Sequence, residues 1–225
     1  MMPSSTVRSS TGMKTVGEIA ISVAGALKIF RRIGIDYGDV WEMPLDEALR
    51  TRDVDLDAIL AEIAALEATP VSAPADSGEL VDYIISHYHQ VHRRELVELL
   101  GLARRVEKVH EDHPQAPAGL AVLLEKAQGE LEDHMMKEER ILFPSICSGY
   151  RGSLFGPIVV MRHEHDDHAK LIHSIYLVTS GLNLPANACG SWRALYAGLE
   201  KLTTDLIEHI HIENDVLFPR FMNAR

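Results

Sequence analysis

Basic charge and long apolar runs are both scarce in this 225-residue sequence. Its 22 lysine and arginine residues stand against 33 aspartate and glutamate residues, for a formal net charge of -11. A protein that binds nucleic acid without sequence preference needs a basic surface to neutralise phosphates, so we expect no nucleic-acid partner. No apolar run approaches 18 residues, and the N-terminal residues lack the apolar core of a signal peptide. We therefore expect a cytoplasmic protein that does not interact with membranes.

Cysteine is also scarce. Cys147 and Cys189 are the two cysteines, too few and too far apart for a disulfide framework or a CxxC metal site, and we expect both to be inert thiols. Histidine, in contrast, is abundant and unevenly placed, because all 12 histidines lie between His87 and His211. This asymmetry divides the chain into a first part without histidine and a histidine-rich second part.

Strand-like alternation is not evident, and the apolar residues recur at helical spacing, which predicts an all-α protein. Prolines and polar stretches divide the chain into a disordered leader, a small helical domain, a linker and a larger helical domain, which we place at residues 1–14, 15–68, 69–79 and 80–225. In the larger domain, four long helical patterns cover about residues 80–110, 118–143, 154–180 and 188–218. Long helices joined by short loops predict an up-down-up-down four-helix bundle.

One motif occurs twice in the second part. Residues 134–144 read HMMKEERILFP and residues 209–219 read HIHIENDVLFP, so both contain His-x3-Glu followed by an apolar pair and Phe-Pro. Positions i and i+4 share a helix face, so each motif presents an imidazole and a carboxylate in one direction. Both pairs lie on the apolar stripe of their helix, where an unpaired carboxylate would cost several kcal/mol. A metal ion is the compensating charge that we expect.

A second repeat completes the pattern. His89-x2-His92 precedes the first motif at nearly the same interval as His165-x2-His168 precedes the second. The larger domain therefore reads as two helix hairpins related by a pseudo-two-fold axis, each with one histidine from its first helix and His-x3-Glu from its second. The predicted metal ligands are His89, His134, Glu138, His165, His209 and Glu213.

Six such ligands suit two metal ions better than one. Two ions bridged by the two carboxylates would use all six side chains and keep an open position on each ion. Imidazole and carboxylate donors without thiolate favour iron or manganese over structural zinc. Any single residue of this set could instead be a hydrogen-bonded core side chain, or all six could line a surface, but the duplicated spacing favours metal binding.

Other polar residues near these motifs are weaker candidates. Glu130 lies one helical turn before His134, and Glu164 directly precedes His165, so either could relay protons or iron at the site. We expect His92 and His168 to support the ligands or to lie on the surface. The remaining histidines are expected at the surface: His87, His110, His113, His163, His173 and His211.

The six-residue pattern on four helices resembles hemerythrin-like domains. From about residue 15 to 220, the chain resembles the iron–sulfur cluster repair di-iron proteins, the RIC family, including nitric-oxide-responsive members. The segments that carry this resemblance are TVGEIA and FRRIGIDY in the smaller, ScdA-type domain, and YHQVHR, DHMMKEERILFP, HEHDDH and EHIHIENDVLFP in the bundle. The resemblance implies a non-haem centre of two iron ions with bridging glutamates, held by the six predicted ligands.

The resemblance implies a protein of the nitrosative and oxidative stress response, which binds nitric oxide at the di-iron centre, supports repair of damaged iron–sulfur clusters, or does both. The alternatives are an oxygen or nitric-oxide carrier or sensor, an iron donor for cluster assembly, and a structural bundle that is metal-free or filled with zinc. Nitric-oxide reductase activity stays open. One departure is that the family typically has a cysteine pair after the IDY segment, where this chain has Gly38 and Asp39.

Overall fold

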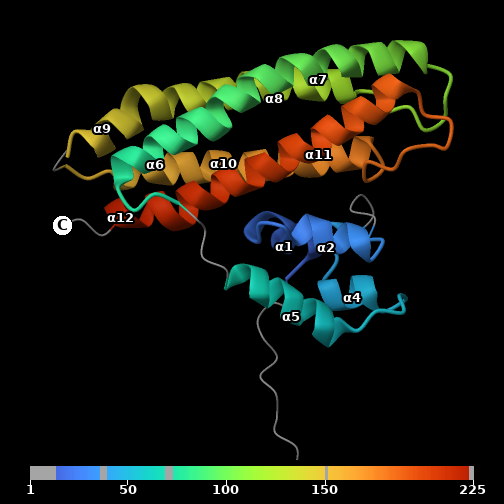
Figure 1. Ribbon diagram of the computed structural model, residues 1–225, viewed down its shortest axis with the longest axis horizontal. Helices are drawn as coiled ribbons and strands as arrows, with labels where there is room; N and C mark the ends of the chain where they lie inside the picture. The colour runs from blue at the N-terminus through green and yellow to red at the C-terminus, as the bar shows by residue number, and fades with distance from the viewer. Residues whose placement is uncertain (1–13, 36–39, 69–72, 150–151, 223–225) are drawn as a thin grey trace, which may run out of the picture. The chain divides into compact units, whose positions relative to one another are not determined.

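The computed structural model describes residues 14–35, 40–68, 73–149 and 152–222. These residues form helices, and their only β-type pairing is an isolated bridge between Thr15 and Pro44, which confirms the all-α class. The chain divides into two compact units, residues 1–70 and 71–225 (Figure 1). Nearly all of the expected leader and both Gly38 and Asp39 lie outside the described residues. None of the described helices is long and apolar enough to span a membrane.

The first unit consists of short helices with defined ends. Thr15 and Glu18 form a capping box: the Thr15 hydroxyl accepts from Glu18 N at 3.1 Å, and Glu18 Oε2 accepts from Thr15 N at 2.8 Å. Gly25, with φ of 91°, separates the first two helices. The Asp55 side chain caps the last helix. The helices are α1 (Val16–Ser22), α2 (Ala26–Arg32), α4 (Leu45–Leu49) and α5 (Leu56–Glu67).

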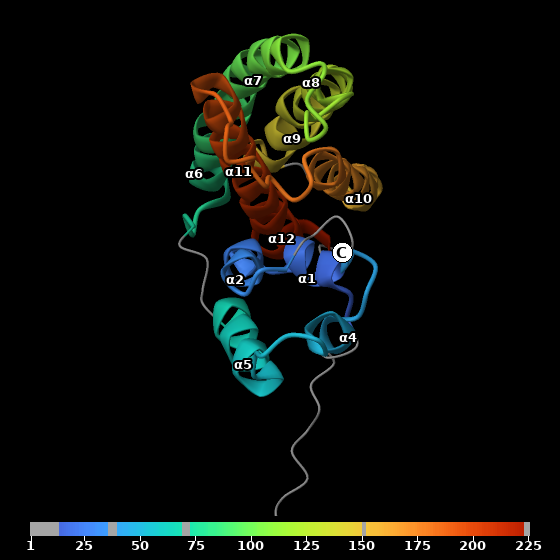
Figure 2. The same ribbon diagram turned by 90° about the vertical axis from the view of Figure 1, so that its right-hand side faces the viewer.

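The second unit contains four long helical segments that alternate in direction, as Figure 1 shows. Segment one is α6 (Ser77–Ile84), η2 (Ile85–His89) and α7 (Gln90–Val109); segment two is α8 (Leu120–Lys137), η3 (Glu138–Leu142) and α9 (Phe143–Cys147). Segment three is α10 (Phe155–Val178); segment four is α11 (Gly190–His211), η4 (Ile212–Leu217) and α12 (Pro219–Met222). Helix α7 packs against α8 and α11, and α8 packs against α10, around a common interior (Figure 2).

The segment ends differ in detail from the sequence prediction. Helix α6 begins at Ser77, inside the stretch predicted as linker, because the Asp76 side chain accepts from Gly78 N and Glu79 N. Segments two and four continue beyond Pro144 and Pro219, which lie in the first turns of α9 and α12. Proline is tolerated there because a first-turn residue needs no backbone N–H donor.

Three segments contain a π-helical turn, namely η2, η3 and η4. Such turns widen the helix by one residue and often occur at functional sites. Close to them, an apolar cluster fills one end of the bundle with Leu80, Ile84, Leu142, Phe143, Ile158, Leu217 and Phe218. The turns and the cluster position the side chains of the candidate site.

Candidate metal centre

The six predicted ligands lie together in the interior of the second unit. Segments one and two contribute His89 at the end of η2, His134 near the end of α8 and Glu138 at the start of η3. Segments three and four contribute His165 from α10, His209 from α11 and Glu213 from η4. Each of these side chains is at most 2% exposed. The fold thus brings together residues that are up to 124 positions apart in the sequence.

Among the described residues, two groups have ligand atoms within 4.8 Å of one another. One group contains His89 and His209, and the other contains His134 and His165. Glu138 and Glu213 belong to both groups. Two neighbouring ions that share both carboxylates would fit this arrangement.

Distances between the imidazole nitrogens fit a metal coordination shell. The Nε2 atoms of His89 and His209 are 3.2 Å apart, and those of His134 and His165 are also 3.2 Å apart. For metal–ligand bonds of about 2.1 Å at right angles, neighbouring ligand atoms lie roughly 3.0 Å from each other. Both pairs therefore match the edge of a coordination polyhedron.

Hydrogen bonds at the opposite ring nitrogens fix three of the four imidazoles. His89 Nδ1 lies 2.8 Å from Glu139 Oε1, and His134 Nδ1 lies 2.9 Å from Glu164 Oε2. His165 Nδ1 lies 3.0 Å from Asn214 Oδ1. Each oxygen accepts, so Nδ1 carries the proton and Nε2 directs a lone pair at the centre. Between His134 and His165, two lone pairs therefore face each other at 3.2 Å, and they repel unless a cation lies beside them.

The glutamates also fit a cation. Neither carboxylate oxygen of Glu138 has a hydrogen-bond partner, although Oε2 lies 3.4 Å from both His89 Nε2 and His134 Nε2. Burial, together with the negative charge of Glu213, raises the pKa of Glu138 well above its ordinary value. The raised pKa favours the protonated carboxyl group in the absence of a cation, and a bound metal would displace that proton.

Basic side chains hold the two supporting glutamates. Arg93 Nη1 donates to Glu139 Oε1 at 2.8 Å, and Lys137 Nζ donates to Glu164 Oε1 at 2.5 Å. The hydrogen bonds from His134 and then Lys137 lower the pKa of Glu164 to about 2. Glu164 is thus ionised at neutral pH, and a charged acceptor makes the imidazole that it supports a stronger metal ligand.

Aromatic rings cover the imidazoles on the apolar side. Phe143 stacks on His89 with ring centroids 5.7 Å apart, and Phe218 stacks on His165 at 5.9 Å. These are the phenylalanines of the repeated Phe-Pro motif, so the motif supplies both a ligand pair and an aromatic cover. Tyr88 stacks on His209 at 5.1 Å.

His92 and His168 are buried, so the surface position considered for them is wrong. Their side chains are 0% and 3% exposed because both lie on the inner face of their helix, one turn beyond a predicted ligand. Both ring nitrogens of His92 and the Nδ1 of His168 lack a hydrogen-bond partner. The His92 ring lies 5.5 Å from His209, and the His168 ring lies 4.8 Å from His134.

The two tentative relay residues differ in position. Glu164 contacts His134 directly, whereas Glu130 is exposed and pairs with Lys126 at 3.5 Å. Both residues nevertheless line the same cavity of about 160 Å³. The other residues that line it are Asp133, Lys137, Asp167 and His168. Of all these lining residues, Glu164 hydrogen-bonds to His134, and the His168 ring lies 4.8 Å from the ring of His134.

Family models match both units of the chain. Residues 80–221 match the family model described as the hemerythrin HHE cation binding domain, and residues 12–67 match ScdA_N, a domain of unknown function. The iron-sulfur cluster repair protein YtfE of Musicola paradisiaca is 42% identical over 94% of this chain and 97% of its own length. This chain belongs to that repair-protein family. YtfE of Escherichia coli O1:K1 is 42% identical over 91% of this chain and 94% of its own length.

The sequence did not reveal several residues that support the predicted metal ligands. Glu139 and Asn214 each directly follow a predicted bridging glutamate and each accept from the first-helix histidine of the same hairpin. They occupy equivalent places in the repeat, but their residue types differ, so the repeat alone did not mark them. Tyr88 was missed as well, although it precedes His89 as Glu164 precedes His165.

Proposed function

We propose that the bundle holds two iron ions, each bound by two histidines and both bridged by Glu138 and Glu213. The observation that supports this most strongly is that both carboxylates belong to both ligand groups. Imidazole and carboxylate donors suit iron, and the family model describes a cation binding domain. When bound, the two ions would supply a redox-active centre with open positions for small diatomic ligands.

We further propose that the centre binds nitric oxide and supports repair of damaged iron–sulfur clusters in the cytoplasm during nitrosative and oxidative stress. The printed names of the relatives, iron-sulfur cluster repair proteins, support the second part. Phe143, Phe218 and Tyr88 keep one side of the centre apolar, which restricts water and admits small uncharged ligands. Damaged cluster proteins or a cluster scaffold would be the partners. Residues 38 and 39 are glycine and aspartate, so the proposed function uses no thiol there.

The direct test is a nitric-oxide titration of the iron-loaded, anaerobically reduced protein. We expect a saturable change in the visible spectrum at two nitric oxide molecules or fewer per chain. Release of nitrous oxide would add turnover to binding, whereas reversal under argon would favour a carrier or sensor. A protein that holds iron and shows no spectral change would contradict nitric-oxide binding. Glu138→Ala serves as the metal-deficient control.

A second candidate function is iron donation to cluster assembly. The acidic cavity at Glu130 favours this function, because Asp133, Asp167 and Glu164 share its lining and His168 connects it to the ligand histidines. Carboxylates along such a path attract a divalent cation. The test follows transfer of labelled iron to a metal-free cluster scaffold by wild type and by Glu130→Gln. Iron donation predicts slower transfer in the variant with unchanged iron content; equal transfer rates would argue against this path.

A further inference from the structure

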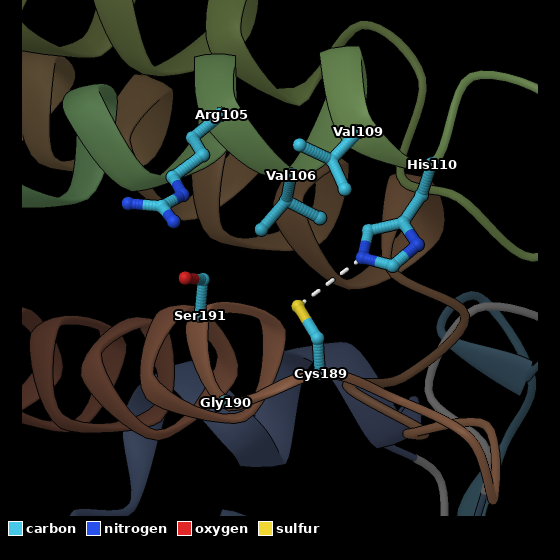
Figure 3. Close-up of a pocket in the computed structure, with 7 residues that line it drawn as sticks. All are labelled: Arg105, Val106, Val109, His110, Cys189, Gly190 and Ser191. Carbon is cyan, nitrogen blue, oxygen red and sulfur yellow. Dashed lines mark hydrogen bonds between the residues drawn. The ribbon is translucent and has the colours of Figure 1, made fainter.

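At some distance along the bundle from the ligands, Cys189 lies beside His110. Cys189 immediately precedes α11, and its Sγ lies 3.1 Å from Nε2 of His110, the residue that follows α7 (Figure 3). The two residues line a partly open cavity of about 320 Å³ together with Arg105 and Val109. Figure 3 shows Sγ directed at the imidazole and the Arg105 guanidinium on the same cavity. A thiol, an imidazole and a cation thus face one space large enough for part of a small molecule.

Three features of the surroundings suit nucleophilic attack by this thiol. At 3.1 Å, Nε2 can take the thiol proton directly. The Trp192 ring lies 4.9 Å from His110, within reach of a cation–π interaction with the imidazolium. The thiolate would lie at the N-terminus of a 22-residue helix, where the helix dipole favours a negative charge.

We propose that Cys189 and His110 form a reactive pair that exchanges with small disulfides carrying a carboxylate, of which glutathione disulfide is the probe. This assignment replaces the expectation that both cysteines are inert. Arg105 selects for the carboxylate, and the cavity accommodates the half of the disulfide that becomes attached. The proposal concerns a modification site separate from the metal centre and does not rest on the function proposed above.

The exchange balances without any further reactant. The Cys189 sulfur attacks one sulfur of the disulfide and forms a new S–S bond, while the original S–S bond breaks. The second half leaves as a thiolate and takes up the proton that His110 received from Cys189. Cys189 is oxidised to the mixed disulfide, and the leaving half is reduced to a thiol.

Cys147 provides an internal comparison. It is the more exposed thiol of the two, so accessibility alone predicts that it reacts first. Burial, followed by the charges of Asp82 and Asp76, raises the pKa of Cys147. A raised pKa lowers the thiolate fraction and therefore the exchange rate. Accessibility therefore predicts faster exchange at Cys147, whereas the surroundings of the two thiols predict faster exchange at Cys189.

The experiment exposes the full chain to glutathione disulfide at pH 7, quenches at intervals and quantifies the glutathione adduct on each cysteine-containing peptide by mass spectrometry. We expect Cys189 to react on the order of tenfold faster than Cys147. In His110→Gln, the Cys189 rate should fall by a similar factor while the Cys147 rate stays unchanged. The Cys147 rate and the circular dichroism spectrum report whether the variant is folded.

Equal or faster reaction at Cys147 in wild type would overturn the proposal without recourse to any variant. A folded His110→Gln protein with an unchanged Cys189 rate would show that His110 is not part of the reactive pair. Arg105→Gln tests the carboxylate: it should slow glutathione disulfide and leave the uncharged hydroxyethyl disulfide unaffected. Equal slowing of both disulfides would contradict the selection by charge.

Discussion

In the hairpin of segments one and two, the residue after the predicted bridging glutamate is Glu139, a carboxylate that accepts from His89. In the hairpin of segments three and four, the corresponding residue is Asn214, a neutral amide that accepts from His165. The residue before the first-helix histidine differs too. Glu164 hydrogen-bonds to His134 across the bundle. Tyr88 instead stacks on His209, and the Nδ1 atom of His209 has no hydrogen-bond partner.

The two hairpins therefore repeat the positions of the ligands but not the chemistry of the residues that support them. Each ligand group has one histidine held by a carboxylate, His89 in one group and His134 in the other. The second histidine of each group has a weaker support, a neutral amide for His165 and a stacked ring for His209. We therefore expect the group of His134 and His165 to bind its ion more tightly.

The largest effect should come from residues that both groups share. In the proposed centre, Glu138→Ala or Glu213→Ala would remove a ligand from both ions at once, so each variant should lose most of its iron. His89→Ala, which belongs to one group, should retain one ion per chain. Iron analysis and Mössbauer spectra after anaerobic purification check this, with exposed Glu130→Ala as the control. A normal two-iron spectrum in either glutamate variant would refute the bridging assignment.

The supporting carboxylates should give the next largest effect. Glu139→Gln and Glu164→Gln keep a hydrogen-bond acceptor but remove its charge, so each should weaken iron binding by about 10- to 100-fold. Competition with a chelator measures the loss for each variant. If the two ligand groups are independent, Glu139→Gln weakens the group of His89 and Glu164→Gln weakens the group of His134. Identical losses at both ions would contradict this independence.

A smaller gain should follow from making the second hairpin resemble the first. Asn214→Asp places a charged acceptor at His165 Nδ1, so the affinity of that group for iron should rise several-fold. Asn187→Asp, an exposed change of the same charge, is the matched control. An equal gain in both variants would mean that net charge, rather than the contact with His165, determines the affinity.

The pH dependence of the metal-free protein should show little difference between the hairpins. Burial, followed by neighbouring histidines, lowers the pKa of His92 to about 2 and of His168 to about 3. The unfolded chain takes up protons at these residues below about pH 6.5 while the folded protein does not, so stability falls as the pH drops. Each histidine should account for roughly 2 kcal/mol between pH 7 and 5.

Denaturation of the metal-free wild type at pH 7 and pH 5 measures this loss, and His92→Phe and His168→Phe should each reduce it by a similar amount. The phenylalanines cannot take up a proton in either state. A loss that is unchanged in both variants would show that other groups cause the acid sensitivity.

The sequence predicted the bundle and the convergence of His89, His134, Glu138, His165, His209 and Glu213 because both follow from helical spacing and an internal repeat. It did not predict the burial of His92 and His168, since i+3 positions lie at the edge of a helix face and can point either way. The π-helical turns were also missed, because a one-residue widening leaves no compositional signal. Glu139 and Asn214 differ between the repeats, so the repeat itself did not mark them as a pair.

In the proposed centre, two ions share Glu138 and Glu213. The most direct test of this centre is an anaerobic titration of the metal-free wild type with ferrous iron, followed by Mössbauer spectroscopy of the oxidised product. We expect saturation at two irons per chain and a spectrum of two magnetically coupled ferric ions. Saturation at one iron, or two irons without magnetic coupling, would contradict the proposed centre.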